Sequence, residues 1–428
     1  MSDHRSAPSP ARDEFLAAVE RRLGERADAV GEAVGRAARH WVVSGRCADP
    51  RRVGDGSAQT MLIAGGLGAA CGPLEAFCAV ADALPEVGAV VVPSGLADRV
   101  APPSGESDGG GGTSARLTSL AAAFAATGKH LLTSVADARE VRAVAEMASA
   151  AAAGAGLRQE SPLVTIVTGS EPPGVGAAIA AARTGLPHLV WAHPTPAAIA
   201  DALTTVAAVQ EQVPGAVSAV AVRSEPSTPL DVGPLSDLAC AVPAVRAFGV
   251  PLVAEVLSTG AETPGWRSSA ENTAAALIAW SAGADAVAGA GRLAAGAVLD
   301  TTSLALDAEI ASYVTATCAG IAVDDEALAL EVIERVGIGG NYLGERHTRR
   351  HMRDVWRSRF FDRSSLEQWK REGRPSSVDL AAAFVQKMVD EQHVDPLDPV
   401  IVAEFGRIVR DAARQDPGEP LSPPKETP

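Results

Sequence analysis

Eight short apolar segments, separated by stretches suited to helices, constrain the fold of this chain more than any other feature. They lie at 60–65, 88–93, 129–134, 162–169, 187–194, 218–224, 250–256 and 284–290. A continuous apolar run is typical of a parallel strand with both faces covered, and helices form the crossovers between such strands. About eight strand–helix repeats within residues 58–295 therefore predict an α/β fold, a (β/α)8 TIM barrel. A doubly wound open sheet is the alternative that this pattern leaves open.

Helical patterns flank the predicted barrel on both sides. Apolar residues recur every three or four positions from Ala11 to about Val43, which predicts an N-terminal helix or helix pair that includes Trp41. From Ala295 to about Arg414 the pattern is helical again, without strand-like runs. We therefore divide the chain into an N-terminal tail and helical segment (1–57), the barrel (58–295), a C-terminal helical extension (296–415) and a disordered tail (416–428).

Composition excludes several classes of protein. The net charge of −15 argues against nucleic acid as the main partner, because phosphate binding needs clustered Lys and Arg. No apolar run reaches the roughly 20 residues of a membrane span, and the polar N-terminus lacks the apolar core of a signal peptide. The five cysteines are scattered without CxxC spacing, which is typical of reduced thiols, and neither they nor the histidines have zinc-ligand spacing. We expect a soluble cytoplasmic protein with no metal site of its own.

In a (β/α)8 barrel, the catalytic and ligand-binding residues lie at the C-terminal ends of the strands. The polar and aromatic residues assigned to that end are His130, Ser170, Glu171, Trp191, His193, Arg223, Glu225, Glu255 and Arg292. Trp191 and Trp266 could form an aromatic cage for a quaternary ammonium group through cation–π attraction. Glu171, Glu225 or Glu255 would add counter-charge, and Arg223 or Arg292 could bind a substrate carboxylate. The alternative is that Trp191 fills the barrel mouth and Trp266 packs a loop.

A glycine motif after the last predicted strand supports a different hypothesis. Gly289-x-Gly291-x-x-Ala294 could cradle a phosphate with its backbone N–H groups. A barrel enzyme that uses a phosphate-bearing ligand near Gly289 and Gly291 is therefore a further alternative.

A long ordered set of motifs dominates the last third of the chain. It runs through "GADAVAGAGRL" (283–293), Asp307-x-Glu309, Val336-Gly337-x-Gly339-Gly340, His347-Thr348 and "RSSLEQWKREG" (363–373). Taken together, residues 283–415 resemble the trimethylamine methyltransferase (MttB-like) family, and a thinner similarity continues upstream.

This resemblance implies a (β/α)8 barrel that transfers a methyl group from a small methylated amine to the Co(I) corrinoid (cobalamin) of a partner protein. The corrinoid protein carries that cofactor, so none is bound directly by this chain. The sequence contains no pyrrolysine, and the chain is therefore most similar to the branch that contains glycine betaine:corrinoid methyltransferases. The resemblance also implies a homo-oligomer. Tyr342, which lies between two of the quoted motifs, and His347, which lies within one, are expected to reach the barrel mouth. They complete the candidate substrate-binding set, which is Trp191, His193, Glu171, Glu225, Glu255, Trp266, Arg292, Tyr342 and His347. No residue is assigned a catalytic role.

The sequence departs from the family in the loop "STGAETPGWRSSAE" (258–271). By ungapped placement, a lysine, an aspartate and a glutamine of many relatives become Glu262, Gly265 and Arg267. A catalytically lapsed barrel that only binds a small ligand or a partner protein is therefore the second hypothesis.

Overall fold

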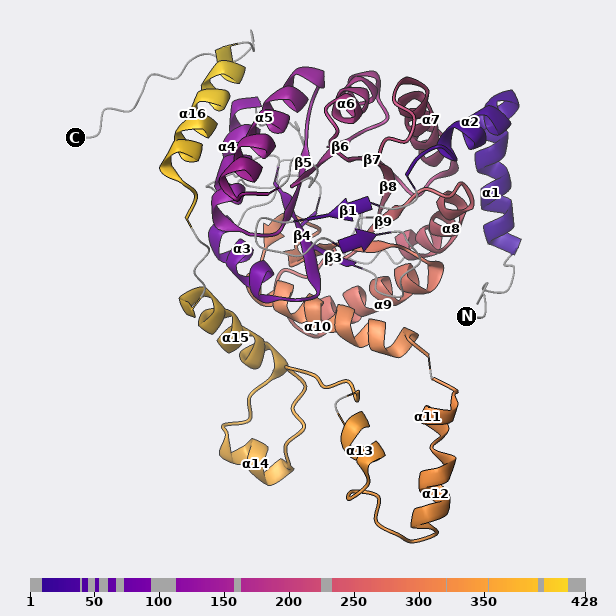
Figure 1. The fold of residues 1–428 in the computed structure, drawn as a ribbon, viewed down its shortest axis with the longest axis vertical. Helices are drawn as coiled ribbons and strands as arrows, with labels where there is room; N and C mark the ends of the chain where they lie inside the picture. The colour runs from indigo at the N-terminus through magenta and orange to yellow at the C-terminus, as the bar shows by residue number, and fades with distance from the viewer. Residues whose placement is uncertain are drawn as a thin grey trace, which may run out of the picture.

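The computed structural model describes residues 10–38, 41–44, 51–53, 61–66, 73–93, 113–157, 163–224, 233–320, 322–352, 354–391 and 396–414. Its centre is a closed barrel of eight parallel strands (Figure 1). The strands are β3 (Met61–Ala64), β4 (Val87–Val92), β5 (His130–Ser134), β6 (Val164–Thr168), β7 (His188–Ala192), β8 (Ser218–Arg223), β9 (Leu252–Glu255) and β10 (Ala286–Ala290). Because β10 pairs with β3, the sheet has no edge, and the predicted barrel is confirmed over the open sheet.

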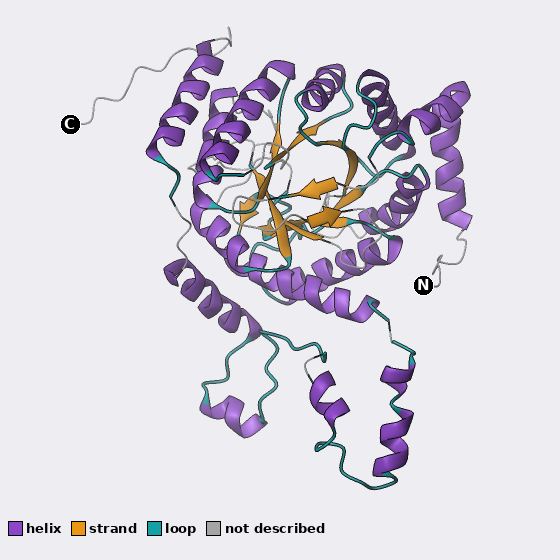
Figure 2. Ribbon diagram, in the orientation of Figure 1, coloured by secondary structure: helices purple, strands orange, loops and turns teal. Residues whose placement is uncertain are grey.

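A helix follows each strand and covers the outside of the barrel (Figure 2). These helices are α3 (Leu74–Ala83), α4 (Thr113–Ala126), α5 (Ala138–Gly154), α6 (Pro172–Arg183), α7 (Pro196–Gln212), α8 (Gly233–Ala247), α9 (Trp266–Ala282) and α10 (Thr301–Cys318). Strand residues alternate between two hydrophobic clusters, because successive side chains point to opposite faces of a sheet. Leu62 and Val90 pack toward the helices, whereas Ile63 and Val91 fill the barrel interior.

The N-terminal segment differs from its prediction. The structure has α1 (Pro10–Leu23), a 3-10 turn η1 (Gly24–Arg26) and α2 (Ala27–Val34), but the helical pattern does not continue to Val43. Instead β1 (Trp41–Val43) pairs with β2 (Arg51–Val53) in an antiparallel hairpin that lies across one end of the barrel (Figure 1). The β-branched pair after Trp41 suits a strand, and Trp41 belongs to the cluster that fills the barrel interior.

His130 closes the same end of the barrel, which corrects its expected position at the mouth. It is the first residue of β5 and is fully buried, so it lies at the N-terminal end of its strand. Its Nδ1 lies 3.1 Å from the carbonyl oxygen of Ser44, and its Nε2 lies 2.9 Å from the hydroxyl of Thr165. The Trp41 indole N–H donates to that same hydroxyl over 3.0 Å. His130 therefore joins the N-terminal hairpin to the barrel floor.

The region after the barrel is mostly helical, as predicted, but it begins with a two-strand hairpin, β11 (Arg292–Leu293) with β12 (Val298–Leu299). Two later helices lie against the barrel wall: α15 (Ser377–Glu391) contacts α3 and α10, and α16 (Pro399–Arg414) contacts α4 and α5. In the segment between α10 and α15, the helices α11 (Asp325–Leu328), α12 (Leu330–Val336), α13 (Arg346–His351) and α14 (Leu366–Arg371) project away from the barrel (Figures 1 and 2). None of the helices within the described ranges is long and apolar enough to cross a membrane.

Candidate functional site

Three neighbouring strands place large polar or aromatic residues at inward positions near their C-terminal ends. Trp191 of β7, Arg223 of β8 and Glu255 of β9 each follow, two residues on, an inward-facing Leu189, Ala221 or Val253. In the strand register Trp191 pairs with Ala221, and Arg223 pairs with Glu255. Alternation along a strand therefore directs all three side chains into the barrel mouth.

A buried charge cluster forms one side of this mouth. The Glu255 Oε1 atom lies 2.9 Å from Nη1 of Arg292 and 3.6 Å from Nε of Arg223. The side chains of Glu255 and Arg292 are each only 2% exposed, whereas that of Arg223 is 17% exposed. Arg292 also donates from Nε and Nη2 to the carbonyl oxygen of Gly296, over 3.3 and 3.1 Å. Arg292 is thus fixed from two sides, and Arg223 presents the more accessible guanidinium.

Two glycines allow this cluster to form. A Cβ atom at Gly66, just after β3, would overlap both the Arg292 guanidinium and the Glu255 carboxylate. A Cβ at Gly296 would overlap the other edge of the same guanidinium, and Gly296 also has a φ of +88°, which favours glycine. Sequence analysis missed both residues because glycine is frequent throughout the chain. Gly66 follows a predicted strand directly, which was the available signal.

The loop between β9 and α9 is organised by Glu271. Its carboxylate accepts hydrogen bonds from the Thr259 hydroxyl (2.5 Å), the Gly260 amide (3.1 Å) and Arg267 Nε (2.8 Å). Partial burial raises the pKa of Glu271, but these hydrogen bonds outweigh it and the pKa lies below the ordinary value. The loop is therefore a fixed element beside the mouth, and Arg267 contributes an ion pair to it.

The glycine motif after β10 does not form a phosphate cradle. The Gly289 amide donates to the carbonyl oxygen of Gly65, and the Gly291 amide donates to Oδ2 of Asp307, each over 2.8 Å. A buried carboxylate thus occupies the position where a phosphate would be held. Burial raises the pKa of Asp307 to about 7, although the hydrogen bonds from Gly291 and Asn272 favour its charged form. The arrangement does not fit a phosphate-bearing ligand.

The two tryptophans of the predicted aromatic cage, Trp191 and Trp266, differ in their burial and in their position. The Trp191 ring is half-buried and contacts the exposed His193 ring edge-on, with 5.3 Å between centroids. Gly169, just after β6, lies beside the Trp191 indole, since a Cβ there would be 3.4 Å from Nε1. Trp266 is the first residue of α9 and is 88% exposed. Within the described ranges, the structure shows no ring contact between Trp191 and Trp266.

The remaining candidates lie apart from this cluster. Glu171 is exposed at the start of α6, and Glu225 lies outside the described residues. Tyr342 and His347 belong to the projecting segment, where His347 Nε2 lies 2.7 Å from the carbonyl oxygen of Glu326. The structure therefore groups Trp191, His193, Glu255 and Arg292 with Arg223, and places Tyr342 and His347 elsewhere. A substrate-binding role for these residues stays a prediction.

Metal-ligating side chains are not gathered at the mouth. Across the described part of the chain, no group of three or more His, Cys, Asp or Glu side chains could hold a metal ion. The mouth instead offers an indole face and a guanidinium–carboxylate cluster. Such a site can bind a small molecule that combines an apolar or cationic group with an acidic one.

Comparison with known proteins agrees with the motifs of the C-terminal region. A family model described as "Trimethylamine methyltransferase (MTTB)" matches residues 237–414, from within α8 to the end of α16. This part of the chain is thus similar to the trimethylamine methyltransferase family. The family assignment expected from the sequence is thereby confirmed, and the match includes Glu255, Arg292 and the projecting helices.

Individual relatives are similar over part of their length. A trimethylamine methyltransferase of Desulfitobacterium hafniense is 33% identical over 148 residues, which cover 35% of this chain and 30% of that protein. A glycine betaine methyltransferase of the same species is 30% identical over 112 residues, or 26% of this chain and 23% of that protein. The chain spans a third or less of the length of these relatives.

Among solved structures, a truncated 3-deoxy-D-arabino-heptulosonate 7-phosphate synthase from Thermotoga maritima is similar to this chain. It has a TM-score of 0.41 and 17% identity, and covers 64% of this chain and 90% of that one.

Proposed function

We propose that the barrel mouth binds a small quaternary amine that also carries a carboxylate, and that a methyl group of this betaine-like compound passes to the Co(I) corrinoid of a partner protein. Family membership supports a methylamine methyltransferase in the broad sense. The choice of a betaine-like substrate rests on the residues of the mouth.

The observation that carries this choice is the pairing of Trp191 with the arginine cluster. Trp191 and Arg223 face inward from adjacent strands, and Arg223 lies two residues beyond the register partner of Trp191. Strand geometry then separates their Cα atoms by roughly 8 Å, a span that two long side chains can bridge around a small zwitterion. The indole face would attract the ammonium group by about 0.5–2 kcal/mol, and Arg223 would bind the carboxylate through charge-assisted hydrogen bonds.

This recognition suits the chemistry of methyl transfer. A quaternary ammonium already carries positive charge, so its carbon–nitrogen bond can break with the electron pair returning to nitrogen, and a neutral tertiary amine leaves. The chain therefore needs no general acid. Its residues would instead remove the cation from water and align one methyl group with the open end of the barrel. The partner's Co(I) corrinoid would supply the nucleophile.

Partner and assembly follow from the same proposal. The match of residues 237–414 to the trimethylamine methyltransferase family, which transfers methyl groups to corrinoid proteins, supports such a partner. We therefore propose a corrinoid protein as the partner and a homo-oligomer as the assembly.

The second hypothesis, a lapsed barrel that only binds its ligand, is supported by the loop after β9. Arg267 forms an ion pair with Glu271, and Trp266 is turned into solvent. In the loop where many relatives carry a lysine, an aspartate and a glutamine, this chain therefore has an ion pair that stabilises the loop. The mouth then keeps only the residues that would bind the ligand.

Methyl transfer to free Co(I) cobalamin distinguishes the two hypotheses. We would mix the reduced cofactor with glycine betaine and the protein, and follow the loss of Co(I) absorbance together with the formation of dimethylglycine. The proposal predicts both signals in wild type and their loss in Trp191→Ala and Arg223→Gln. Arg246→Gln, whose partner Asp285 lies just before β10 at the opposite end of the barrel, is the matched control and should keep full activity. Binding of glycine betaine without transfer would support the lapsed barrel.

A further inference from the structure

A buried carboxylate behind the mouth has no role in the binding scheme described above. Asp307 lies in the second turn of α10 and is only 3% exposed. Burial raises its pKa to about 7, so holding the charged form in this place opposes folding. A buried charge of this kind calls for a functional explanation, and the contacts of Asp307 supply one.

Two N–H groups from different elements donate to this carboxylate. Its Oδ2 atom accepts from the backbone amide of Gly291, in the turn after β10, over 2.8 Å. Its Oδ1 atom accepts from the side-chain amide of Asn272, on α9, also over 2.8 Å. Asp307 therefore ties the turn after β10 to the two helices that lie behind it.

The turn after β10 depends on these contacts for its shape. Gly289 and Gly291 have φ angles of +104° and +80°, which glycine adopts easily, so the backbone alone does not fix the turn. The start of α10 holds Gly291 by both of its backbone polar groups. The amide donates to Asp307, and the carbonyl oxygen accepts from the Asp300 amide over 2.8 Å. The direction of the next residue, Arg292, follows from this double contact.

The position of Arg292 decides which arginine pairs with Glu255. Nη1 of Arg292 lies 2.9 Å from Oε1 of Glu255, whereas Nε of Arg223 lies 3.6 Å from the same atom, beyond hydrogen-bonding distance. While Arg292 holds Glu255, Arg223 can turn toward a ligand carboxylate. If Arg292 moved away, Glu255 would be buried without its counter-charge and would take Arg223 as its new partner.

We propose that Asp307 is a positioning residue for the carboxylate subsite of the mouth, which is the part where Arg223 meets the ligand. It acts through Gly291 and Arg292 and does not touch the ligand. By holding Arg292 against Glu255, it leaves Arg223 to bind the carboxylate. This inference rests on the proposed function, because it requires a ligand whose carboxylate Arg223 binds. It adds a residue that selects betaine-like compounds over simple quaternary amines.

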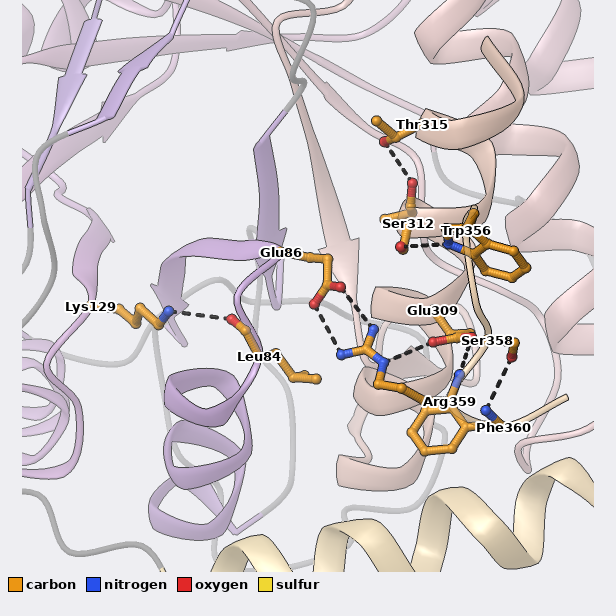
Figure 3. A network of polar contacts seen from close by, with 11 residues as sticks. Leu84, Glu86, Lys129, Glu309, Ser312, Thr315, Trp356, Ser358, Arg359 and Phe360 are labelled. Atoms are coloured by element: carbon orange, nitrogen blue, oxygen red, sulfur yellow. Dashed lines mark hydrogen bonds and ion pairs between the residues drawn. The ribbon is translucent and has the colours of Figure 1, made fainter. Parts of the chain in front are cut away.

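Glu309, two residues farther along α10, provides a matched comparison. It is also 3% exposed, but its carboxylate accepts from the backbone amide and from Nε of Arg359, each over 2.8 Å (Figure 3). Arg359 in turn pairs with Glu86, just before β4, at 2.9 Å. These contacts fasten the segment after α13 to the barrel, away from the mouth. Glu309 thus matches Asp307 in charge, burial and helix, but it holds a different part of the chain.

Calorimetric titration with glycine betaine and with tetramethylammonium tests the inference, because the second ligand has the cation without the carboxylate. Asp307→Ala and Asp307→Leu both remove the acceptor, and one leaves its space empty whereas the other fills it. Each should bind glycine betaine about tenfold less tightly, as expected for the loss of one charge-assisted hydrogen bond, and tetramethylammonium as wild type does. Asp307→Asn keeps an oxygen for the Gly291 amide and should keep the preference for glycine betaine. Glu309→Ala should leave both affinities unchanged.

The outcomes separate this inference from the proposed function. If wild type prefers glycine betaine and the alanine and leucine variants keep that preference, Asp307 does not position the subsite, and the proposed function still stands. Equal weakening of both ligands, or the same loss in Glu309→Ala, would show a general effect on the fold and would also overturn the inference. A loss in Asp307→Asn as large as in Asp307→Ala would contradict the contact with Gly291 as its basis. If wild type itself does not prefer glycine betaine, the proposed carboxylate subsite is wrong and the inference fails with it.

Discussion

At the scale of single residues, the cluster of Glu255, Arg292 and Arg223 at the mouth is held together by the pairing of buried opposite charges. Glu255 and Arg292 are both nearly inaccessible, so each depends on the other for compensation. Sequence analysis selected both residues because they lie at or just after the C-terminal ends of predicted strands. It could not predict their mutual contact, which depends on the open space at Gly66.

Removal of Glu255 should destabilise the fold strongly. Glu255→Ala leaves the Arg292 guanidinium buried without its counter-charge, at a cost of about 3–5 kcal/mol in the free energy of unfolding. Urea denaturation at neutral pH measures this change. Glu32→Ala removes a surface carboxylate that pairs with Arg36, and should change stability by less than about 0.5 kcal/mol. Equal effects of the two substitutions would contradict the account of the cluster.

The burial of His188 predicts that the free energy of unfolding decreases in acid. It is fully buried with neither ring nitrogen hydrogen-bonded among the described residues, and burial lowers its pKa from 6.5 to about 4. Between these values the unfolded chain binds the proton more readily, so stability is complete above pH 6.5 and falls as the pH decreases toward 4. His188→Leu should reduce this loss, because no imidazole remains to be protonated. The free energy of unfolding at pH 7 and pH 5 tests this, and an unchanged acid dependence in the variant would refute it.

At the scale of elements, the eight strands were predictable because a parallel strand that is covered on both faces appears in the sequence as a continuous apolar run. The β1–β2 hairpin was not, because Trp41 also fits the helical spacing of the preceding residues. The β-branched pair Val42 and Val43 is a weak local signal for a strand, and the contacts of Trp41 with Thr165 and His130 favour the strand over a helix. Tertiary packing overrides local pattern most easily in segments as short as three residues.

Asp307 joins α10 to the turn after β10, and its raised pKa predicts a pH dependence opposite to that of His188. The folded state holds the proton up to about pH 7, whereas the ordinary pKa of the carboxyl is 3.8. The stabilisation from this group is therefore present in acid and is lost as the pH rises through about 7. Asp307→Asn cannot ionise, so its unfolding free energy should decline less than that of wild type between pH 5.5 and pH 8. A parallel decline in both proteins would show that Asp307 is not the titrating group.

At the scale of the whole molecule, the candidate site could be predicted only in part. Trp191, Glu255 and Arg292 were found because a barrel collects the ends of its strands at one mouth. Trp266 was expected beside Trp191 but is 88% exposed, and loop conformation is not encoded in a repeating pattern. Tyr342 and His347 were expected at the mouth from resemblance alone, and the structure places them in the segment that projects from the barrel between α10 and α15. The direction in which this segment projects depends on contacts far apart in the sequence, such as the ion pair between Arg359 and Glu309, which no local pattern reveals.

The central claim is that the mouth binds a zwitterionic methylated amine, and calorimetric titration of wild type with glycine betaine and with choline tests it most directly. The two ligands share the trimethylammonium group, and only glycine betaine carries a carboxylate for Arg223. A charge-assisted hydrogen bond contributes about 1.5–3 kcal/mol, so glycine betaine should bind at least about tenfold more tightly than choline. Equal or tighter binding of choline, or no binding of either ligand, would contradict the account.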